Sequence, residues 1–197
     1  EALELGKAMA GVLEEAHKRG ILHRDIKPSN IGYDARRTPK LLDFGVARIR
    51  DPQTPAPAHV VETISLDRLQ QGGAGVPQTQ DAPLTETGAI VGTPAYMPLE
   101  AYQNQEPGPA FDLWALAVTL YESLSGVNPF RAATPAETIE RLLRHDPDPL
   151  HEVRPDCPRE LSDFLVRALS RTPGGRPGSA AEFRSALDGI GTGSPRP

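Results

Sequence analysis

Residues 23–30 read His-Arg-Asp-Ile-Lys-Pro-Ser-Asn, and residues 43–45 read Asp-Phe-Gly. The first stretch places charged and amide side chains close together, between a helical pattern and a short apolar run. The second begins at Asp43, which is thirteen positions after Asn30 and follows another short apolar run. Asp-Phe-Gly alone is a weak signal, and a surface loop can hold polar residues by chance. In this order and at this spacing the two stretches form a specific pattern, so we take them together as the candidate site.

The sequence around the candidate site predicts a mainly helical fold with a small β-hairpin region. Upstream, apolar residues from Leu5 to Ala16 repeat with the helical period, and Gly20 is expected to end that helix. A hairpin is predicted around the polar turn 34–39, because short apolar runs lie on both sides of it. The expected strands are residues 21–22, 31–33 and 40–42.

Further along the chain the pattern is helical. Residues 111–124 are apolar on most faces and are followed by Gly126, which is typical of a helix buried in the centre of a fold. Two capping boxes predict the starts of later helices, because the N-cap hydroxyl and the Glu three residues later satisfy backbone N–H groups reciprocally. The boxes are Thr134–Glu137 and Ser179–Glu182, and residues 160–169 carry a further apolar helical face.

Composition excludes several classes of function. The chain has 197 residues, of which 38% are hydrophobic, and this length suits one domain with a single core. A formal net charge of −5 argues against a nucleic-acid-binding surface, because proteins that neutralise phosphates carry a basic excess. No apolar run approaches the ~20 residues of a membrane-spanning helix. The single cysteine, Cys157, excludes an intramolecular disulfide and favours a reduced, cytoplasmic setting.

Proline and glycine together make up 39 of the 197 residues, which suggests long irregular stretches. Residues 51–87 contain five prolines, no aromatic residue and one basic residue, so we predict that they are mostly disordered. Residues 191–197 form a polar tail or the start of a linker. The predicted domain therefore spans residues 1–190 and contains one long insert.

The candidate site resembles the catalytic loop and the metal-binding turn of the eukaryotic-like protein kinases, in particular the bacterial serine/threonine type. Further matches follow in the order expected for that family. They are the substrate-binding loop at 92–97, the glutamate of the Ala-Pro-Glu turn at Glu100, the start of the central helix at 112–116, and landmarks at 128–130 and 176–177. The resemblance covers nearly all of the chain and implies the C-terminal lobe of a protein-kinase-like fold.

The resemblance implies transfer of the γ-phosphate of ATP, with Mg²⁺ as cofactor, to a Ser or Thr hydroxyl of a protein substrate. Asp25 is expected to accept or orient the proton of the substrate hydroxyl. Lys27 is expected to place a positive charge at the γ-phosphate, and Thr93 to bridge towards Asp25 and Lys27. Asn30 and Asp43 are expected to supply oxygen ligands for Mg²⁺, a hard cation that suits amide, carboxylate and phosphate oxygens. With Lys27 they form the expected ATP site.

Other residues of the motifs are expected to be structural. His23 and Phe44 are expected to pack in the interior, as in the regulatory spine of the family. Asp112 is expected to hold the backbone of the catalytic loop rather than to meet substrate. Glu100 and Arg176 are expected to form a buried ion pair, because the loss of either partner would leave a buried charge.

The insert lies in the part of the chain that corresponds to the family's activation segment. In the family, the positions of Arg24 and Arg48 bind a phosphorylated residue of this segment. Thr85 and Thr87, shortly before Gly92, are the expected phosphorylation sites, because a phosphate opposite two arginines can order a disordered loop. An unregulated, solvated loop is the alternative.

A kinase of this family also needs an N-terminal lobe with a glycine-rich loop and a strand lysine. The catalytic loop begins at residue 23 and the chain starts at Glu1 rather than Met, so we expect this lobe to lie upstream in the natural protein. The glycine-rich run 72–75 lacks flanking strands and is rejected as that loop. Two positions depart from the family. Gly32 replaces the apolar residue that forms the floor under adenine, and Pro98-Leu99 replaces Ala-Pro.

Three functions fit these residues. The first is a segment of a bacterial-type serine/threonine kinase, expected to transfer negligible phosphate in isolation. The second is a pseudokinase-like protein-binding module, which the missing ATP-clamping elements favour. The third is a small-molecule kinase of the same fold, which Thr93 and the complete substrate loop disfavour. The joint presence of Asp25, Lys27, Asn30 and Asp43 favours the first.

Overall fold

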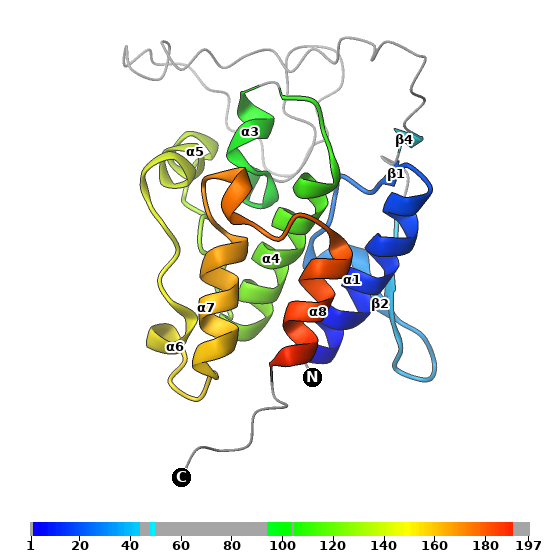
Figure 1. Cartoon of the computed structure of the whole chain (residues 1–197). Coiled ribbons are helices and arrows are strands. Elements are labelled where there is room, and N and C mark those ends of the chain that lie inside the picture. Colours follow the sequence, from blue (N-terminus) through cyan, green and yellow to red (C-terminus); the bar gives the residue numbers. More distant parts are fainter. Residues whose placement is uncertain (1, 44–47, 50–93, 104, 191–197) are drawn as a thin grey trace.

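The computed structural model describes residues 2–43, 48–49, 94–103 and 105–190. The helices are α1 (Ala2–Lys18), α3 (Leu99–Tyr102), α4 (Pro109–Ser125), α5 (Pro135–Arg144), α6 (Leu150–Val153), α7 (Arg159–Ala168) and α8 (Ala180–Gly189). The strands are β1 (Ile21–Leu22), β2 (Ile31–Tyr33), β3 (Pro39–Leu41) and β4 (Arg48–Ile49), and the 3₁₀ turns are η1 (Pro28–Asn30), η3 (Pro94–Tyr96) and η4 (Pro173–Gly175). The described part is mainly helical with a small β-structure, as the sequence predicts (Figure 1). The predicted disordered insert 51–87 and the tail 191–197 lie outside the described residues.

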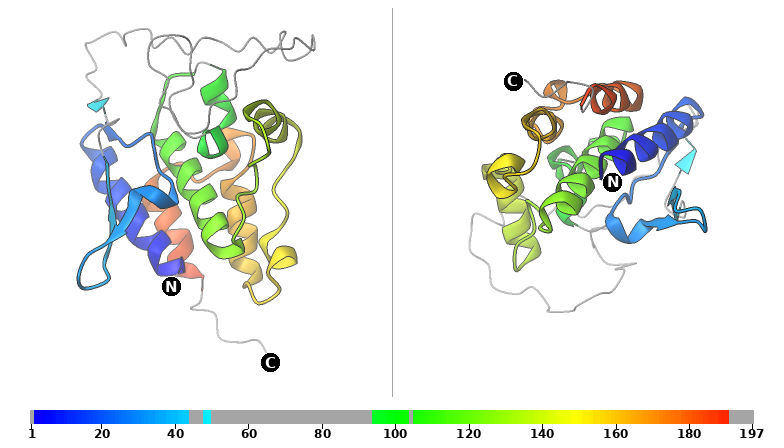
Figure 2. Two further views of the ribbon diagram at one scale, coloured as in Figure 1. Left: turned by 180° about the vertical axis from the view of Figure 1, so that it is seen from behind. Right: turned by 90° about the horizontal axis from the view of Figure 1, so that it is seen from below.

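Helix α4 is the centre of the fold, as the three views in Figures 1 and 2 show. It begins at Pro109, whose fixed φ suits the first turn of a helix, and ends before Gly126, which has a left-handed φ of 80°. The run from Asp112 to Tyr121 is buried throughout, because α1, α6, α7 and α8 all pack against it. The burial of a helix that is apolar on most faces agrees with the prediction for 111–124.

Helix α1 buries its apolar stripe against α8 and α4 (Figure 1). The three helices approach closely at Gly6, where an added Cβ would lie 2.8 Å from Leu187 of α8 and 2.9 Å from Leu120 of α4. A larger residue at this point would therefore force the side chains of Leu187 and Leu120 to move. Gly20 has a φ of 70° and follows the end of the helix, as its position in the sequence predicts.

The predicted hairpin is present, with β2 and β3 paired antiparallel. The Asp34 carboxylate closes its turn by accepting hydrogen bonds from the backbone N–H groups of Thr38 and Arg36, both at 2.9 Å. These two hydrogen bonds hold the pKa of Asp34 below its usual value, and the bond from Thr38 has the larger effect. Strand β3 covers 39–41 rather than the predicted 40–42. A second antiparallel pair joins β1 to β4, which the sequence did not predict.

Both predicted capping boxes begin helices. The hydrogen bonds that the two glutamate side chains accept differ from those expected of a capping box. The Thr134 hydroxyl accepts from the N–H of Glu137 at 3.2 Å at the start of α5, and Ser179 accepts from Glu182 at 3.1 Å at the start of α8. Each Glu carboxylate then accepts from the N–H of the residue before the N-cap, not from the N-cap itself. The two donors are Ala133 and Gly178.

A buried ion pair joins α3 to the residue after η4. Two guanidinium nitrogens of Arg176 donate to the two carboxylate oxygens of Glu100, and the side chains are only 2% and 4% exposed. Arg176 also donates to the carbonyl of Ser170 at 2.7 Å and lies 4.4 Å from the ring centre of Trp114 on α4. These contacts offset the cost of removing both charges from water. The pair therefore fixes α3 to the central helix.

We expect Glu100→Ala to lower the free energy of unfolding by about 3–5 kcal/mol, because the charge of Arg176 would remain buried without its partner. Urea denaturation followed by circular dichroism measures this change. Asp156→Ala is the matched control, since Asp156 pairs with Arg154 on the surface, where an ion pair contributes little. Equal losses in the two variants would contradict the structural role of the buried pair.

Candidate active site

Residues 23–30 form a loop between β1 and β2, and η1 is its last turn. Because β1 pairs with β4 and β2 pairs with β3, a short antiparallel pair holds each end of this loop. Contacts from Asp112 of α4 and from Leu42, the residue after β3, fix the loop between its two ends.

The buried carboxylate of Asp112, in the first turn of α4, binds the backbone of the loop. It accepts hydrogen bonds from the N–H groups of His23 at 3.0 Å and Arg24 at 2.8 Å. His17 of α1 donates through Nε2 to the same carboxylate at 2.8 Å. Three donors offset the cost of burying a carboxylate. They also hold Arg24 at a φ of 68°, a left-handed conformation that is costly for a residue with a side chain.

His23 is fully buried and links the loop to the end of β3. Its Nδ1 accepts a hydrogen bond from the N–H of Asp25 at 3.3 Å, so the ring hydrogen lies on Nε2. Nε2 donates to the carbonyl oxygen of Leu42 at 2.9 Å. The two ring nitrogens thus tie the predicted catalytic aspartate to the strand that precedes Asp43.

The side chains of Asp25, Lys27 and Asn30 meet at one point. Oδ2 of Asp25 lies 2.9 Å from Nζ of Lys27 and 2.9 Å from Nδ2 of Asn30. Nδ2 of Asn30 also donates to the backbone carbonyl of Asp25 at 2.8 Å. The Asn30 amide therefore turns its nitrogen towards Asp25, and its Oδ1 accepts no hydrogen bond from any residue that the structure describes. We call these three residues the Asp25 cluster.

Asp43 follows the strand that pairs with Asn30. Leu42 donates its N–H to the carbonyl of Asn30 at 2.8 Å, which continues the β2–β3 ladder to the residue before Asp43. Asp43 is exposed and has a φ of 60°. Amide and carboxylate oxygens at neighbouring strand ends fit the donor preference of Mg²⁺, which keeps several positions for water and phosphate. No group of three or more His, Cys, Asp or Glu residues within the described ranges is arranged to hold a metal.

The two arginines predicted to bind a phosphate come from neighbouring backbone segments. Arg48 of β4 lies opposite Leu22 of β1, and Arg24 is two residues further along the chain from Leu22. The described structure does not extend to the Arg48 side chain. Four predicted residues lie wholly outside the described ranges, and their roles stay predictions. They are Phe44, Thr85, Thr87 and Thr93.

A second polar cluster, which the sequence analysis missed, fixes the segment after residue 93. Tyr96 donates its hydroxyl hydrogen to Glu122 of α4 and accepts a hydrogen bond from Arg131 at 3.1 Å. Burial, together with the bond to Glu122, raises the pKa of Tyr96 to about 12. Asn128 donates Nδ2 to Glu122 at 3.3 Å. One feature of the sequence indicates this cluster: Glu122 is a carboxylate in a mostly apolar helix, and such a carboxylate needs polar partners.

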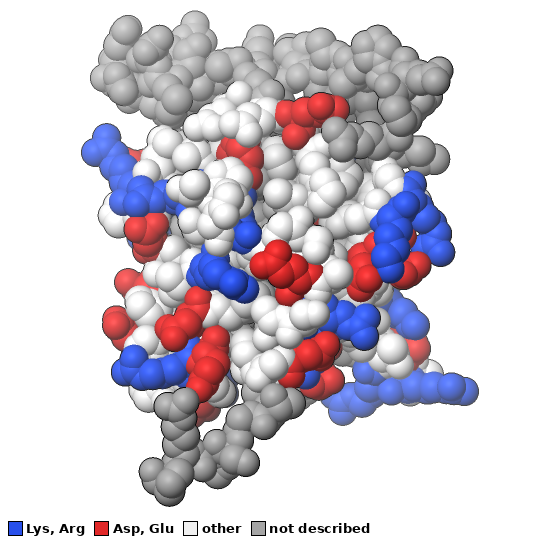
Figure 3. Space-filling model, in the orientation of Figure 1, with Lys and Arg blue, Asp and Glu red and all other residues white. Residues whose placement is uncertain are grey.

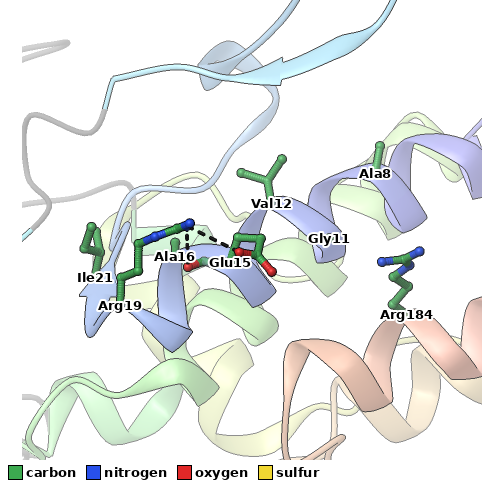
Figure 4. Close-up of a pocket in the computed structure, with 8 residues that line it drawn as sticks. All are labelled: Ala8, Gly11, Val12, Glu15, Ala16, Arg19, Ile21 and Arg184. Atoms are coloured by element: carbon green, nitrogen blue, oxygen red, sulfur yellow. Dashed lines mark hydrogen bonds and ion pairs between the residues drawn. The ribbon is translucent and has the colours of Figure 1, made fainter.

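A shallow hollow of about 600 Å³ lies elsewhere on the surface, between α1 and Arg184 of α8 (Figure 4). Small and apolar side chains line most of it, and Glu15 pairs there with Arg19. No residue predicted to act in catalysis or regulation lines this hollow. It is therefore separate from the Asp25 cluster.

The charged surface is mixed in sign. Acidic and basic side chains lie next to one another over most of the face in Figure 3. Within the described part of the chain, every helix is too short or too polar to cross a bilayer.

Comparison with known proteins identifies the family. Residues 1–187 match the family model of the protein kinase domain. The chain belongs to the protein kinase family. It is 32% identical over 184 residues to the serine/threonine-protein kinase pkn3 of Myxococcus xanthus, and 32% identical over 188 residues to the serine/threonine-protein kinase PknK of Mycobacterium tuberculosis. The resemblance to bacterial serine/threonine kinases that the motifs indicate is thereby confirmed.

The kinase relatives are much longer than this chain. A third relative, the serine/threonine-protein kinase PknB of Mycobacterium leprae, is 28% identical over 195 residues. The three alignments cover 90%, 95% and 99% of this chain, but only 29%, 14% and 27% of pkn3, PknK and PknB. The chain therefore spans less than a third of the length of each of these kinases.

We expect Asp112→Ala to lower the free energy of unfolding by about 2–6 kcal/mol, because the N–H groups of His23 and Arg24 would each lose their acceptor. Native-state hydrogen exchange locates the effect, and the amide of Arg24 should lose protection. Asp163→Ala is the matched control, since Asp163 is exposed on α7. Unchanged protection of Arg24 in Asp112→Ala would show that the carboxylate does not hold the loop.

Proposed function

We propose that the chain is the C-terminal lobe of a serine/threonine protein kinase domain and takes part in transferring the γ-phosphate of ATP to a protein Ser or Thr hydroxyl. Membership of the protein kinase family supports this class of reaction. The observation that carries the proposal is that the Asp25 carboxylate contacts both Lys27 and Asn30 at 2.9 Å. A carboxylate, a cation and an amide thus meet at one point.

The proposed mechanism gives each residue of the cluster one task. Asp25 accepts or orients the proton of the substrate hydroxyl, whose oxygen attacks the γ-phosphorus. Lys27 carries three N–H donors, so its contact with Asp25 leaves donors for phosphate oxygens. Asn30, oriented by Asp25, and Asp43 would hold Mg²⁺, which when bound neutralises charge on the phosphates. Thr93 is proposed to bridge towards Asp25 and Lys27.

Prior arrangement of these groups matters because phosphoryl transfer depends mainly on positioning and charge stabilisation. The Asp25 backbone is fixed by the ring of His23, and the adjoining backbone is fixed by Asp112. The Asp25 carboxylate remains partly exposed, as a group that meets a substrate hydroxyl must be. The interior contacts therefore support a site that needs little reorganisation when a substrate binds.

The positions of the four lysines support the proposal that this chain is only the C-terminal lobe of the kinase domain. All four lie within the described residues. Lys7 and Lys18 lie on the surface of α1 and pair with acidic residues of α1 and α8, whereas Lys40 lies on β3 and pairs with Asp34 at 3.6 Å. Only Lys27 joins the Asp25 cluster. We therefore propose that the natural protein supplies the strand lysine and the glycine-rich loop from an N-terminal lobe, without which this chain transfers negligible phosphate.

We expect Asp25→Asn, made in the full-length natural protein, to lower the rate of phosphate transfer about 10²–10⁴-fold, because an amide cannot accept the substrate proton. Incorporation of labelled γ-phosphate into a Ser or Thr peptide measures the rate. Ser29→Ala is the control, since Ser29 is an exposed residue of the same loop. A wild-type rate in Asp25→Asn would contradict the role of Asp25. A wild-type protein with no transfer activity would favour the protein-binding module instead.

We also propose that phosphorylation of Thr85 or Thr87 activates the protein by pairing with Arg24 and Arg48. The backbone pairing of β1 with β4, which brings the two arginine segments together, supports this proposal. Replacing both threonines by alanine in the full-length protein should lower activity by on the order of tenfold. Thr54→Ala, in the same predicted insert, is the control. Equal activity of the double variant and the wild type would contradict this regulation.

A further inference from the structure

Arg131 lies in the turn between α4 and α5, where several contacts fix both its backbone and its side chain. Its N–H donates to Oδ1 of Asn128 at 3.0 Å, and its carbonyl oxygen accepts a hydrogen bond from Nη1 of Arg141 at 3.0 Å. Its Nη2 donates to the Tyr96 hydroxyl at 3.1 Å and lies 3.8 Å from Oε1 of Glu122. The guanidinium carbon lies 5.9 Å from the centre of the Tyr96 ring. The guanidinium therefore has a defined position next to η3.

The contacts of Arg131 use only part of its guanidinium. Both side-chain contacts involve Nη2, so Nε and Nη1 donate to no residue that the structure describes. The side chain of Arg131 is 55% exposed, whereas that of Glu122 is 19% exposed. A guanidinium carries five N–H donors, so an anion that reaches this surface finds donors whose position is already fixed. Arg131 can therefore bind an acidic group from outside the chain.

Arg141 brings a second positive charge to the same surface. It lies on α5, which is beside η3 and α3 (Figure 1). Glu137 precedes Arg141 by one turn of this helix, but its carboxylate accepts the N–H of Ala133. Arg141 donates instead to the carbonyl of Arg131, and it forms no ion pair with an acidic side chain in the ranges that the structure describes. Its charge therefore adds to that of Arg131.

The Glu122 carboxylate beside Arg131 already has its own partners. Its Oε2 accepts hydrogen bonds from the Tyr96 hydroxyl and from Nδ2 of Asn128. A basic side chain from outside would therefore meet two arginines and a carboxylate that is mostly buried and already hydrogen-bonded. Like charges placed together are unfavourable, so this surface favours an acidic ligand over a basic one.

The position of Tyr96 places this surface near the expected path of a peptide substrate. Tyr96 follows Thr93 by three residues, and three residues of chain span at most ~11 Å. In the proposed function Thr93 bridges towards Asp25 and Lys27, beside which the substrate hydroxyl reacts. An extended peptide rises about 3.3 Å per residue, so side chains a few residues from the reacting hydroxyl can reach Arg131.

We propose that Arg131 and Arg141 bind the carboxylate of an Asp or Glu close to the phosphorylated Ser or Thr, so that the protein prefers acidic peptide substrates. This inference rests on the proposed kinase function and names the substrate class. Arg131 makes the main contact because its guanidinium is held by Tyr96, and Arg141 adds charge. Neither arginine takes part in moving the phosphate, so the preference is expected in KM rather than in kcat.

Steady-state kinetics of the full-length natural protein with synthetic peptides test this proposal. Each peptide contains one Ser and a single Glu, placed in turn at each of about five positions on either side of the Ser. A matched peptide carries Gln at the same position. At one or two neighbouring positions the value of kcat/KM should be about fivefold higher for the Glu peptide than for the Gln peptide, through a lower KM.

Three variants test whether the arginines cause this preference. Arg131→Gln removes the charge and should lower the Glu-to-Gln ratio of kcat/KM to about one, whereas Arg131→Lys keeps a positive charge and should retain a ratio above about two. Arg144→Gln is the matched control, because Arg144 is exposed on α5 and pairs with Glu140. It should leave the ratio unchanged. Thermal melts by circular dichroism verify each fold. Arg141→Gln, which should lower the ratio by about half, replaces Arg131→Gln if the latter is unfolded.

Three results would overturn the proposal. They are equal kcat/KM values for the Glu and Gln peptides at every position, a preference that persists in Arg131→Gln, and an equal loss of preference in Arg144→Gln. If one of these occurs while the Ser peptides are still phosphorylated, the proposed kinase function stands and the role of Arg131 fails. A wild-type protein that phosphorylates none of the peptides overturns both.

Discussion

The rest of this structure depends on the hydrogen bonds that the buried carboxylate of Asp112 accepts. It lies in the first turn of α4, where a negative charge also complements the helix dipole. A carboxylate in the interior needs hydrogen-bond donors, and the N–H groups of His23 and Arg24 and the ring of His17 supply them. Burial of α4 in the core therefore also determines the backbone path of the loop that carries Asp25.

Helix α4 positions three separate segments through polar groups on an otherwise apolar helix. Asp112 holds the loop of the Asp25 cluster, the Trp114 ring contacts the guanidinium of the buried ion pair, and Glu122 holds Tyr96. Apolar packing fixes the helix, and the three contacts then fix chain segments that are far from it in the sequence. In this way a general driving force, burial of apolar surface, leads to specific placement of polar groups.

Local patterns predicted the elements of this fold well. The periodicity of α1 and α4, the N-caps Thr134 and Ser179, and the polar turn of the hairpin each depend on residues close in sequence. The order of the polar motifs led from there to the protein kinase family. The four-residue helices α3 and α6 were missed because a single turn shows no periodicity.

The contacts that complete the site could not be predicted from local patterns. His17 and Asp112 are 95 positions apart, and nothing near either residue in the sequence indicates that they meet. Gly32 was recognised as a departure from the family, but only the register of the hairpin shows that Leu42 fills the space beside it. Such pairings arise when packed elements bring distant residues together, so they require the three-dimensional arrangement.

The central claim is that the cluster of Asp25, Lys27 and Asn30, held in place from α4, serves phosphate transfer to a hydroxyl. The most direct test is transfer of labelled γ-phosphate from Mg·ATP by the full-length natural protein to a peptide with one Ser, compared with the same peptide carrying Ala. We predict label on the Ser peptide only, and loss of this label when Mg²⁺ is chelated. A folded protein that binds Mg·ATP but labels neither the peptide nor itself would contradict the account.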